Sequence, residues 1–73
     1  MSVTRVFVNE RPVEVDPGAS VGAAVAIHDP GLADELARGG AYVTDGVGRP
    51  LNAADPVGAG TIIRVIRSTP GTA

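Results

Sequence analysis

Alternating apolar and polar residues predict a β-hairpin near the start of the chain. In Thr4–Val8 two valines share one face, and Phe7 stands on the opposite face. Residues 9–11 form the turn, with Asn9 suited to a left-handed conformation, and residues 12–15 continue the alternation. We therefore expect a hairpin whose inner face carries Val6, Val8, Val13 and Val15.

A main helix is predicted directly after the hairpin. Proline and glycine at residues 17–18 end the preceding strand, and Ser20 stands where an N-cap is expected. Its hydroxyl can accept a hydrogen bond from a backbone N–H one turn later. Apolar and small residues then recur at helical spacing as far as His28, so one face of this helix can cover a sheet.

A second, shorter helix is predicted to follow the first. Asp29 is typical of an N-cap, and Pro30 fits the first helical position, where its missing N–H needs no partner. The glycines at 39 and 40 end this helix, one of them in a left-handed conformation. Its expected apolar side consists of Leu32, Ala33, Leu36 and Ala37.

The remaining residues predict short strands and loops. A short strand, a turn, a brief extended segment and a loop are expected, in that order, over residues 41–44, 45–46, 47–51 and 52–60. Residues 61–67 are rich in β-branched side chains, which favours a central strand. We expect one domain over residues 1–67 and a flexible tail over residues 68–73.

This order of elements predicts the fold. A hairpin, a helix across its face, a short strand and a long final strand follow one another in the β-grasp order. A right-handed crossover would place the last strand beside the first and parallel to it. We therefore expect an α+β fold of the ubiquitin-like β-grasp type. Its mixed sheet should have about four strands, covered by one main helix plus a short second helix.

Several segments also resemble a known family. VNERPVEV, PGASV, TDG and VGAGTIIRV are similar, in order and spacing, to the ThiS/MoaD sulfur-carrier group of β-grasp proteins. The resemblance covers roughly residues 4–67. It implies a β-grasp fold. For the carriers themselves it implies that the chain ends in Gly-Gly. An ATP-using partner adenylates the terminal carboxylate of such a carrier, and the adenylate is then converted to a thiocarboxylate.

The C-terminus departs from that family pattern. The chain ends in Ser68, Thr69, Pro70, Gly71, Thr72 and Ala73. In such carriers the extended tail must pass through a narrow channel to be adenylated. Proline fixes the backbone, and threonine is branched, so the tail of this chain is poorly suited to that path. The only Gly-Gly, at residues 39–40, is the predicted helix stop. The resemblance therefore carries over the fold and not the activity.

Composition excludes several classes of site. The 73 residues include no cysteine and one histidine, which excludes disulfides, thiolate chemistry and a multi-histidine metal site within one chain. The net charge is −2 without a basic stripe, and two aromatic residues give no stacking platform, so we expect no nucleic-acid partner. No apolar run approaches about 20 residues, and no signal-peptide pattern opens the sequence. We expect no cofactor, no membrane partner and a cytoplasmic location.

Three features that suggest chemistry also have simpler explanations. His28 has no visible nucleophile beside it and fits the C-terminal end of a helix. Residues 45–49 resemble a phosphate-binding glycine loop, but they lack a following helix and a lysine, so a tight turn is favoured. The acidic residues 29, 34 and 35 fit the start of a helix better than a cation site.

The outer face of the sheet is the strongest candidate site. If Ile63 and Val65 point into the core, Ile62 and Ile66 face the other way together with Phe7. A single main helix leaves that face uncovered. The expected docking patch is apolar at its centre and bordered by arginines: Phe7, Ile62, Ile66, Arg5, Arg64 and Arg67. The simpler alternative is a strand with incidental exposed apolar side chains, which are common.

Two functions from different classes follow. The first is a noncatalytic, ubiquitin-like protein-binding module or small subunit that docks on a larger protein, or on a second copy, through this face. The alternative is a sulfur carrier with an atypical or processed C-terminus in thiamine, molybdopterin or related biosynthesis. The intact mass of the protein from its native cell separates them, because a carrier must appear trimmed or with sulfur in place of oxygen.

Overall fold

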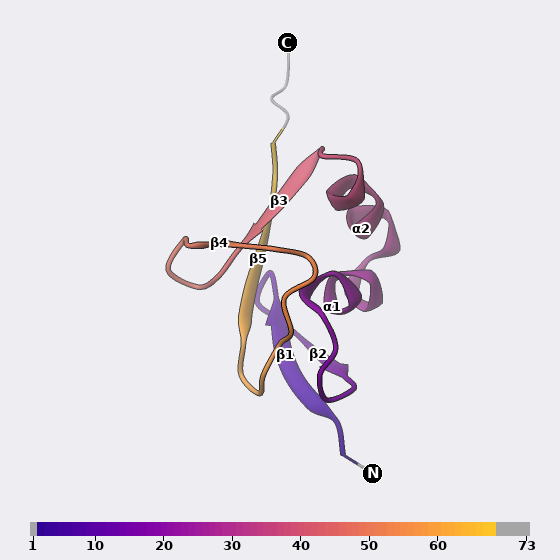
Figure 1. Cartoon of the computed structure of the whole chain (residues 1–73), viewed down its shortest axis with the longest axis vertical. Helices are drawn as coiled ribbons and strands as arrows, with labels where there is room; N and C mark the ends of the chain where they lie inside the picture. The colour runs from indigo at the N-terminus through magenta and orange to yellow at the C-terminus, as the bar shows by residue number, and fades with distance from the viewer. Residues whose placement is uncertain (1, 69–73) are drawn as a thin grey trace.

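The computed structural model describes residues 2–68, which form a mixed sheet with two helices packed on one of its faces (Figure 1). The elements are β1 (Thr4–Val8), β2 (Arg11–Val15), α1 (Val21–His28), α2 (Pro30–Ala37), β3 (Ala41–Thr44), β4 (Pro50–Leu51) and β5 (Ile62–Arg67). The strand order is β2-β1-β5-β3-β4. The sheet therefore has five strands and not about four, because the extended segment before the long loop pairs with β3 as a strand of its own.

A two-residue turn joins the first two strands. Asn9 and Glu10 both have positive φ angles, of 51° and 72°, and Val8 pairs directly with Arg11. Positive φ at both central positions is what a tight hairpin turn needs to match the twist of the strands. The predicted hairpin is confirmed, but β2 begins at Arg11, one residue earlier than expected.

The last strand lies at the centre of the sheet. β5 pairs with β1 in parallel orientation, as the sequence predicted for a crossover fold, and with β3 in antiparallel orientation. The N–H groups of Phe7 and Asn9 donate to the carbonyls of Thr61 and Ile63, both at 2.9 Å. The Asn9 side chain extends this hydrogen bonding between β1 and β5, because its Oδ1 accepts from the Val65 N–H at 2.9 Å.

The start of α1 is held from two directions. Ser20 is its N-cap, with Oγ accepting from the Ala23 N–H at 3.1 Å, as predicted. The long loop between β4 and β5 satisfies the two preceding donors. The N–H groups of Val21 and Gly22 each donate at 2.8 Å, to the carbonyls of Asp55 and Ala53. This loop thus fixes the position of the helix over the sheet.

The second helix begins and ends as predicted. Asp29 caps α2 by accepting from the Gly31 N–H at 3.0 Å, and Pro30 occupies its first position. Gly39 has a φ of 82° and ends the helix in the left-handed conformation. Leu32 is buried, and Ala33 and Leu36 pack against the core. Ala37 is exposed and does not belong to the apolar side.

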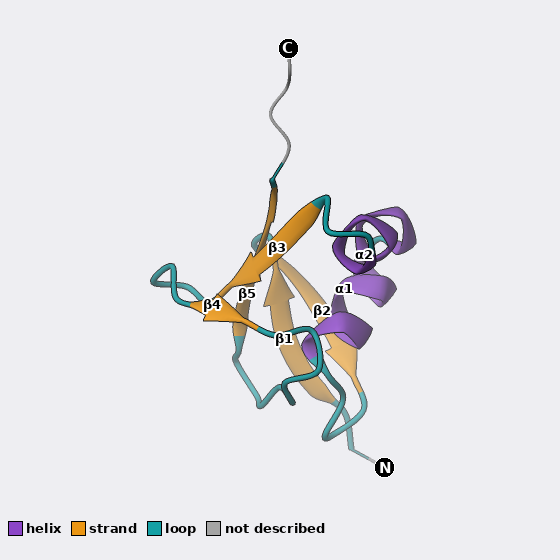
Figure 2. Ribbon diagram, turned by 45° about the horizontal axis from the view of Figure 1, so that its top comes forward, coloured by secondary structure: helices purple, strands orange, loops and turns teal. Residues whose placement is uncertain are grey.

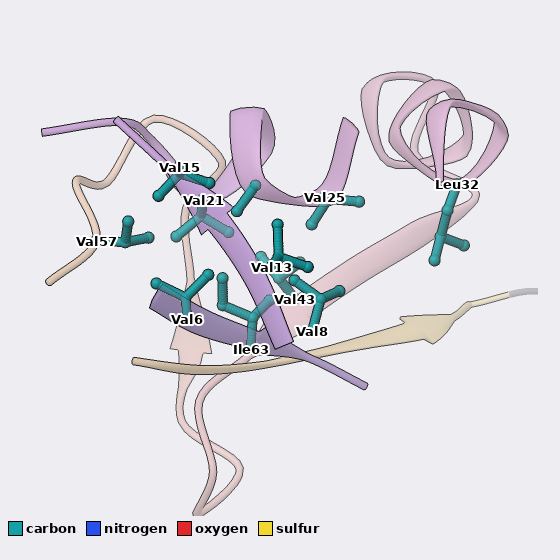
Figure 3. Close-up of a cluster of buried hydrophobic side chains, with 11 residues drawn as sticks. Val6, Val8, Val13, Val15, Val21, Val25, Leu32, Val43, Val57 and Ile63 are labelled. Atoms are coloured by element: carbon teal, nitrogen blue, oxygen red, sulfur yellow. The ribbon is translucent and has the colours of Figure 1, made fainter. Parts of the chain in front are cut away.

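The core between sheet and helices is aliphatic (Figure 3). Val6 and Val8 from β1 and Ile63 from β5 are each 0% exposed, beneath the valines of α1. Val65 is half-buried and packs against the same cluster. The cluster consists of Val6, Val8, Val13, Val15, Val21, Ala24, Val25, Leu32, Val43, Val57 and Ile63, so neither aromatic residue belongs to it.

Ser68, the residue after β5, is hydrogen-bonded to the chain before β3 and does not begin the tail as expected. Ser68 donates from its N–H to the Gly40 carbonyl at 3.0 Å and from its hydroxyl to the Gly39 carbonyl at 3.1 Å. It continues the ladder between β3 and β5 and is not the first residue of a free tail. The other predicted tail residues lie outside the described residues: Thr69, Pro70, Gly71, Thr72 and Ala73.

Candidate functional site: the outer face of the sheet

Strand register brings four apolar side chains onto the sheet face opposite the helices. Residues directly opposite each other on neighbouring strands point to the same face. Phe7 of β1 is opposite Ile62 of β5, and Tyr42 of β3 is opposite Ile66 of β5. We call these four residues, Phe7, Tyr42, Ile62 and Ile66, the outer patch.

The members of the outer patch differ in how far they reach into solvent. Tyr42 is 47% exposed, Ile62 46% and Ile66 39%, so it is their grouping on one face that marks them out. Phe7 is only half-buried and not fully exposed. Its neighbours explain this, because Pro12 lies beside it on β2 and Ile62 on β5.

Within residues 2–68, no helix covers this face. α1 contacts β1 and β2, and α2 contacts β3. Both helices lie on the same side of the sheet (Figure 2), which is the side of the buried valines. The turn after β3 lies beside the outer patch, since a Cβ placed on Gly46 would lie 3.3 Å from Ile62 Cγ2. Three of the four side chains of the outer patch are exposed to solvent.

Tyr42 is the patch residue that sequence reasoning missed. Its signal was present in the sequence, because Tyr42 alternates with Ala41 and Val43, both of which are buried. A short strand at residues 41–44 was predicted, but its two faces were not assigned. With Tyr42 included, both aromatic residues of the chain lie on the outer face.

The three arginines expected around the patch have different surroundings. Arg5 lies on the outer face and forms an ion pair with Glu14 at 3.1 Å. Arg64 lies on the same face between Ile62 and Ile66, opposite Thr44. Among residues 2–68 no carboxylate lies within 4.0 Å of its guanidinium.

Arg67 is not where the sequence interpretation placed it. It is opposite the buried Ala41, on the face that carries the helices, and its Nη1 lies 4.0 Å from Glu35 Oε2 of α2. The reason is strand parity, because Arg67 is an odd number of residues from both Ile62 and Ile66. The expectation that Arg67 borders the outer patch is therefore wrong.

The glycine-containing turn after β3 satisfies its own donors. Asp45 Oδ1 accepts from the N–H groups of Val47 and Arg49, both at 2.9 Å. The bond from the Arg49 N–H is the main reason that the pKa of Asp45 lies below its ordinary value. Because a side-chain carboxylate already occupies these N–H groups, the turn is not arranged to hold a phosphate.

The three acidic candidates of the second helix have structural partners. Asp29 is the α2 cap described above, and Asp34 forms an ion pair with Arg38 at 3.3 Å. Glu35 lies 3.9 Å from the same arginine. His28 is half-buried at the end of α1. Within residues 2–68 no three acidic, histidine or cysteine side chains are grouped as a metal site would require.

Both edges of the sheet are unsuited to pairing with another strand. β2 carries Pro12, which has no N–H to donate, and the charged residues Arg11 and Glu14. β4 at the other edge has two residues, one of them Pro50. Neither described helix is long and apolar enough to cross a membrane.

Searches of protein-family models, of curated protein sequences and of solved structures found no match to this chain.

Proposed function

We propose that this chain is a noncatalytic, ubiquitin-like β-grasp module that docks on a larger protein through the outer patch. The observation that carries the proposal is the position of Phe7, Tyr42, Ile62 and Ile66 on three adjacent strands, on the face that the described helices leave open. The β-grasp assignment is supported by the parallel β1–β5 pair at the centre of the sheet and by the ThiS/MoaD resemblance.

Energetics favour a partner over incidental exposure. Burying one large apolar side chain contributes about 1.5–3 kcal/mol, and a chain of this size has a small core. The core cluster here is built from valines, one alanine, one leucine and one isoleucine, while both aromatic side chains lie outside it. Docking would bury these aromatic side chains, which folding leaves outside the core, and so would gain their free energy of burial. Tyrosine is also frequent among residues that dominate interface energies.

The shape of the surface favours face docking over edge pairing. A partner that adds a strand needs a row of free N–H and C=O groups. Pro12 on β2 and the two-residue length of β4 remove most of such a row at both edges. The outer face has no such obstacle, because three of the four side chains of the outer patch are exposed to solvent.

The test compares two exposed isoleucines that lie on different sides of the molecule. Ile66 belongs to the outer patch, and Ile27 is 59% exposed on α1. Ile66→Asp should abolish capture of the partner by the full-length protein from lysate of its native cell, and Ile27→Asp should leave capture unchanged. Both variants should melt within a few degrees of the wild type. Equal capture by all three proteins would contradict docking through the outer patch.

A further inference from the structure

One cationic side chain divides the outer patch. Arg64 projects from β5 between Ile62 and Ile66, so Phe7–Ile62 lies on one side of it and Tyr42–Ile66 on the other. Four residues of strand separate the two apolar pairs by ~13 Å. An interface that covers both pairs must also cover the Arg64 guanidinium.

That guanidinium has no ionic partner within the described chain. Arg5, the other outer-face arginine, already pairs with Glu14. Thr44 lies opposite Arg64, but its hydroxyl donates to the Asp45 carbonyl. Glu10 lines the same small hollow as Arg64 and Ile66, yet among residues 2–68 it makes no ion pair with Arg64. Docking would therefore remove Arg64 from water without supplying an internal carboxylate.

A charge withdrawn from water is costly unless the interface pairs it. Among protein side chains a carboxylate matches arginine well, because it can accept two parallel hydrogen bonds from the planar fork. Resting on the proposed docking function, we infer that Arg64 receives an Asp or Glu side chain of a different protein. The contacting surface of that partner should be apolar, with one carboxylate near its centre.

A second copy of this chain does not fit the same surface. A two-fold contact presents the same patch from both subunits, so it must be complementary to itself. An axis that buries both apolar pairs passes close to Arg64 and brings two guanidinium groups together. Like charges at close range oppose each other, most strongly once water is excluded. The chain has a net charge of −2; the strand residues of the outer face contribute two arginines and one glutamate, and Glu10 of the hairpin turn lies beside Arg64.

The experiment begins by identifying the partner from the outer face itself. Tyr42 is replaced by the photoreactive p-benzoylphenylalanine in the full-length chain, and the protein is crosslinked in its native cell. The control carries the same photoreactive residue in place of Ile27 on α1. The protein crosslinked from position 42 alone is then purified, and its dissociation constant is measured for wild type and for Arg64 variants.

We expect Arg64→Gln to weaken binding about tenfold or more, Arg64→Glu to weaken it further, and Arg64→Lys to weaken it less than Arg64→Gln. Arg38→Gln on α2 is the matched control and should bind as the wild type does. A partner that binds Arg64→Gln within twofold of the wild type overturns the carboxylate inference and leaves the docking function standing. A crosslink to a second copy of the chain overturns the choice of partner. No crosslink from position 42 contradicts the docking function itself.

Discussion

Asn9 links two parts of the chain that are 56 residues apart. Its φ of 51° lets the hairpin turn close, and its Oδ1 takes the Val65 N–H that would otherwise have no partner beyond the end of β1. Asparagine enters the left-handed region more easily than other non-glycine residues. One side chain thus serves both the local turn and the long-range parallel pairing.

Two substitutions at Asn9 separate these roles. Asn9→Gly keeps the turn but removes the acceptor, which should cost about 1 kcal/mol of unfolding free energy. Asn9→Ala removes the acceptor and also puts at this positive φ a residue that lacks asparagine's tolerance of the left-handed region, so it should cost about 2 kcal/mol in total. Urea denaturation measures both values. If Asn9→Gly is as stable as the wild type, the bond to Val65 contributes nothing.

Asp45 makes the stability of the folded chain depend on pH. Its pKa is lowered in the folded chain, chiefly by the hydrogen bond from the Arg49 N–H. A lowered pKa means that its stabilising contribution is present at neutral pH and is lost as the pH falls below about 4. Asp45→Asn should therefore be less stable than the wild type at pH 7, and the difference should shrink by pH 2. Melting temperatures at the two pH values measure this; a constant difference would contradict it.

At the scale of the elements, the features set by neighbouring residues were predictable from the sequence. Ser20 and Asp29 were recognised as caps because a side-chain oxygen before a helix meets unpaired N–H groups whatever the tertiary structure. Gly39 was recognised as a stop because few residues adopt its backbone conformation. The hairpin and the central β5 followed from alternation and β-branched composition in the same way.

Features that depend on pairing between distant residues were missed. Pro50–Leu51 becomes a strand only because β3 lies beside it, and two residues carry no periodic signal. Tyr42 joins the outer patch through its register with Ile66. Arg67 was placed on the wrong face because its parity with Ile66 was not applied. The Phe7, Ile62 and Ile66 part of the patch could be predicted, while its docking role remains a proposal.

Adjacent residues on β5 should respond oppositely to the same substitution. Val65 packs against the core, so Val65→Asp forces a charge into an apolar region and should unfold a domain of this size. Ile66→Asp on the outer face should cost about 1 kcal/mol or less, which is a shift of several degrees in Tm. Thermal melts of the two variants measure the difference. A folded Val65→Asp protein or an unfolded Ile66→Asp protein would contradict the assigned faces.

At the scale of the whole molecule, the two faces of one sheet have different compositions. The inner face is aliphatic and covered by both helices, whereas the outer face carries the two aromatic residues and two arginines. When residues 2–68 fold, the helices bury the inner face, and the outer face stays uncovered. The central claim is therefore that another protein completes the outer face.

Side-chain footprinting tests that claim most directly. Hydroxyl radicals label exposed side chains, so Tyr42, Ile66 and the control Ile27 can be followed by mass spectrometry, with and without the partner. We predict that labelling of Tyr42 and Ile66 falls severalfold on binding, while labelling of Ile27 on α1 stays constant. Protection of Ile27 with unchanged labelling of Tyr42 and Ile66 would show that the partner binds the helical side, and would contradict the claim.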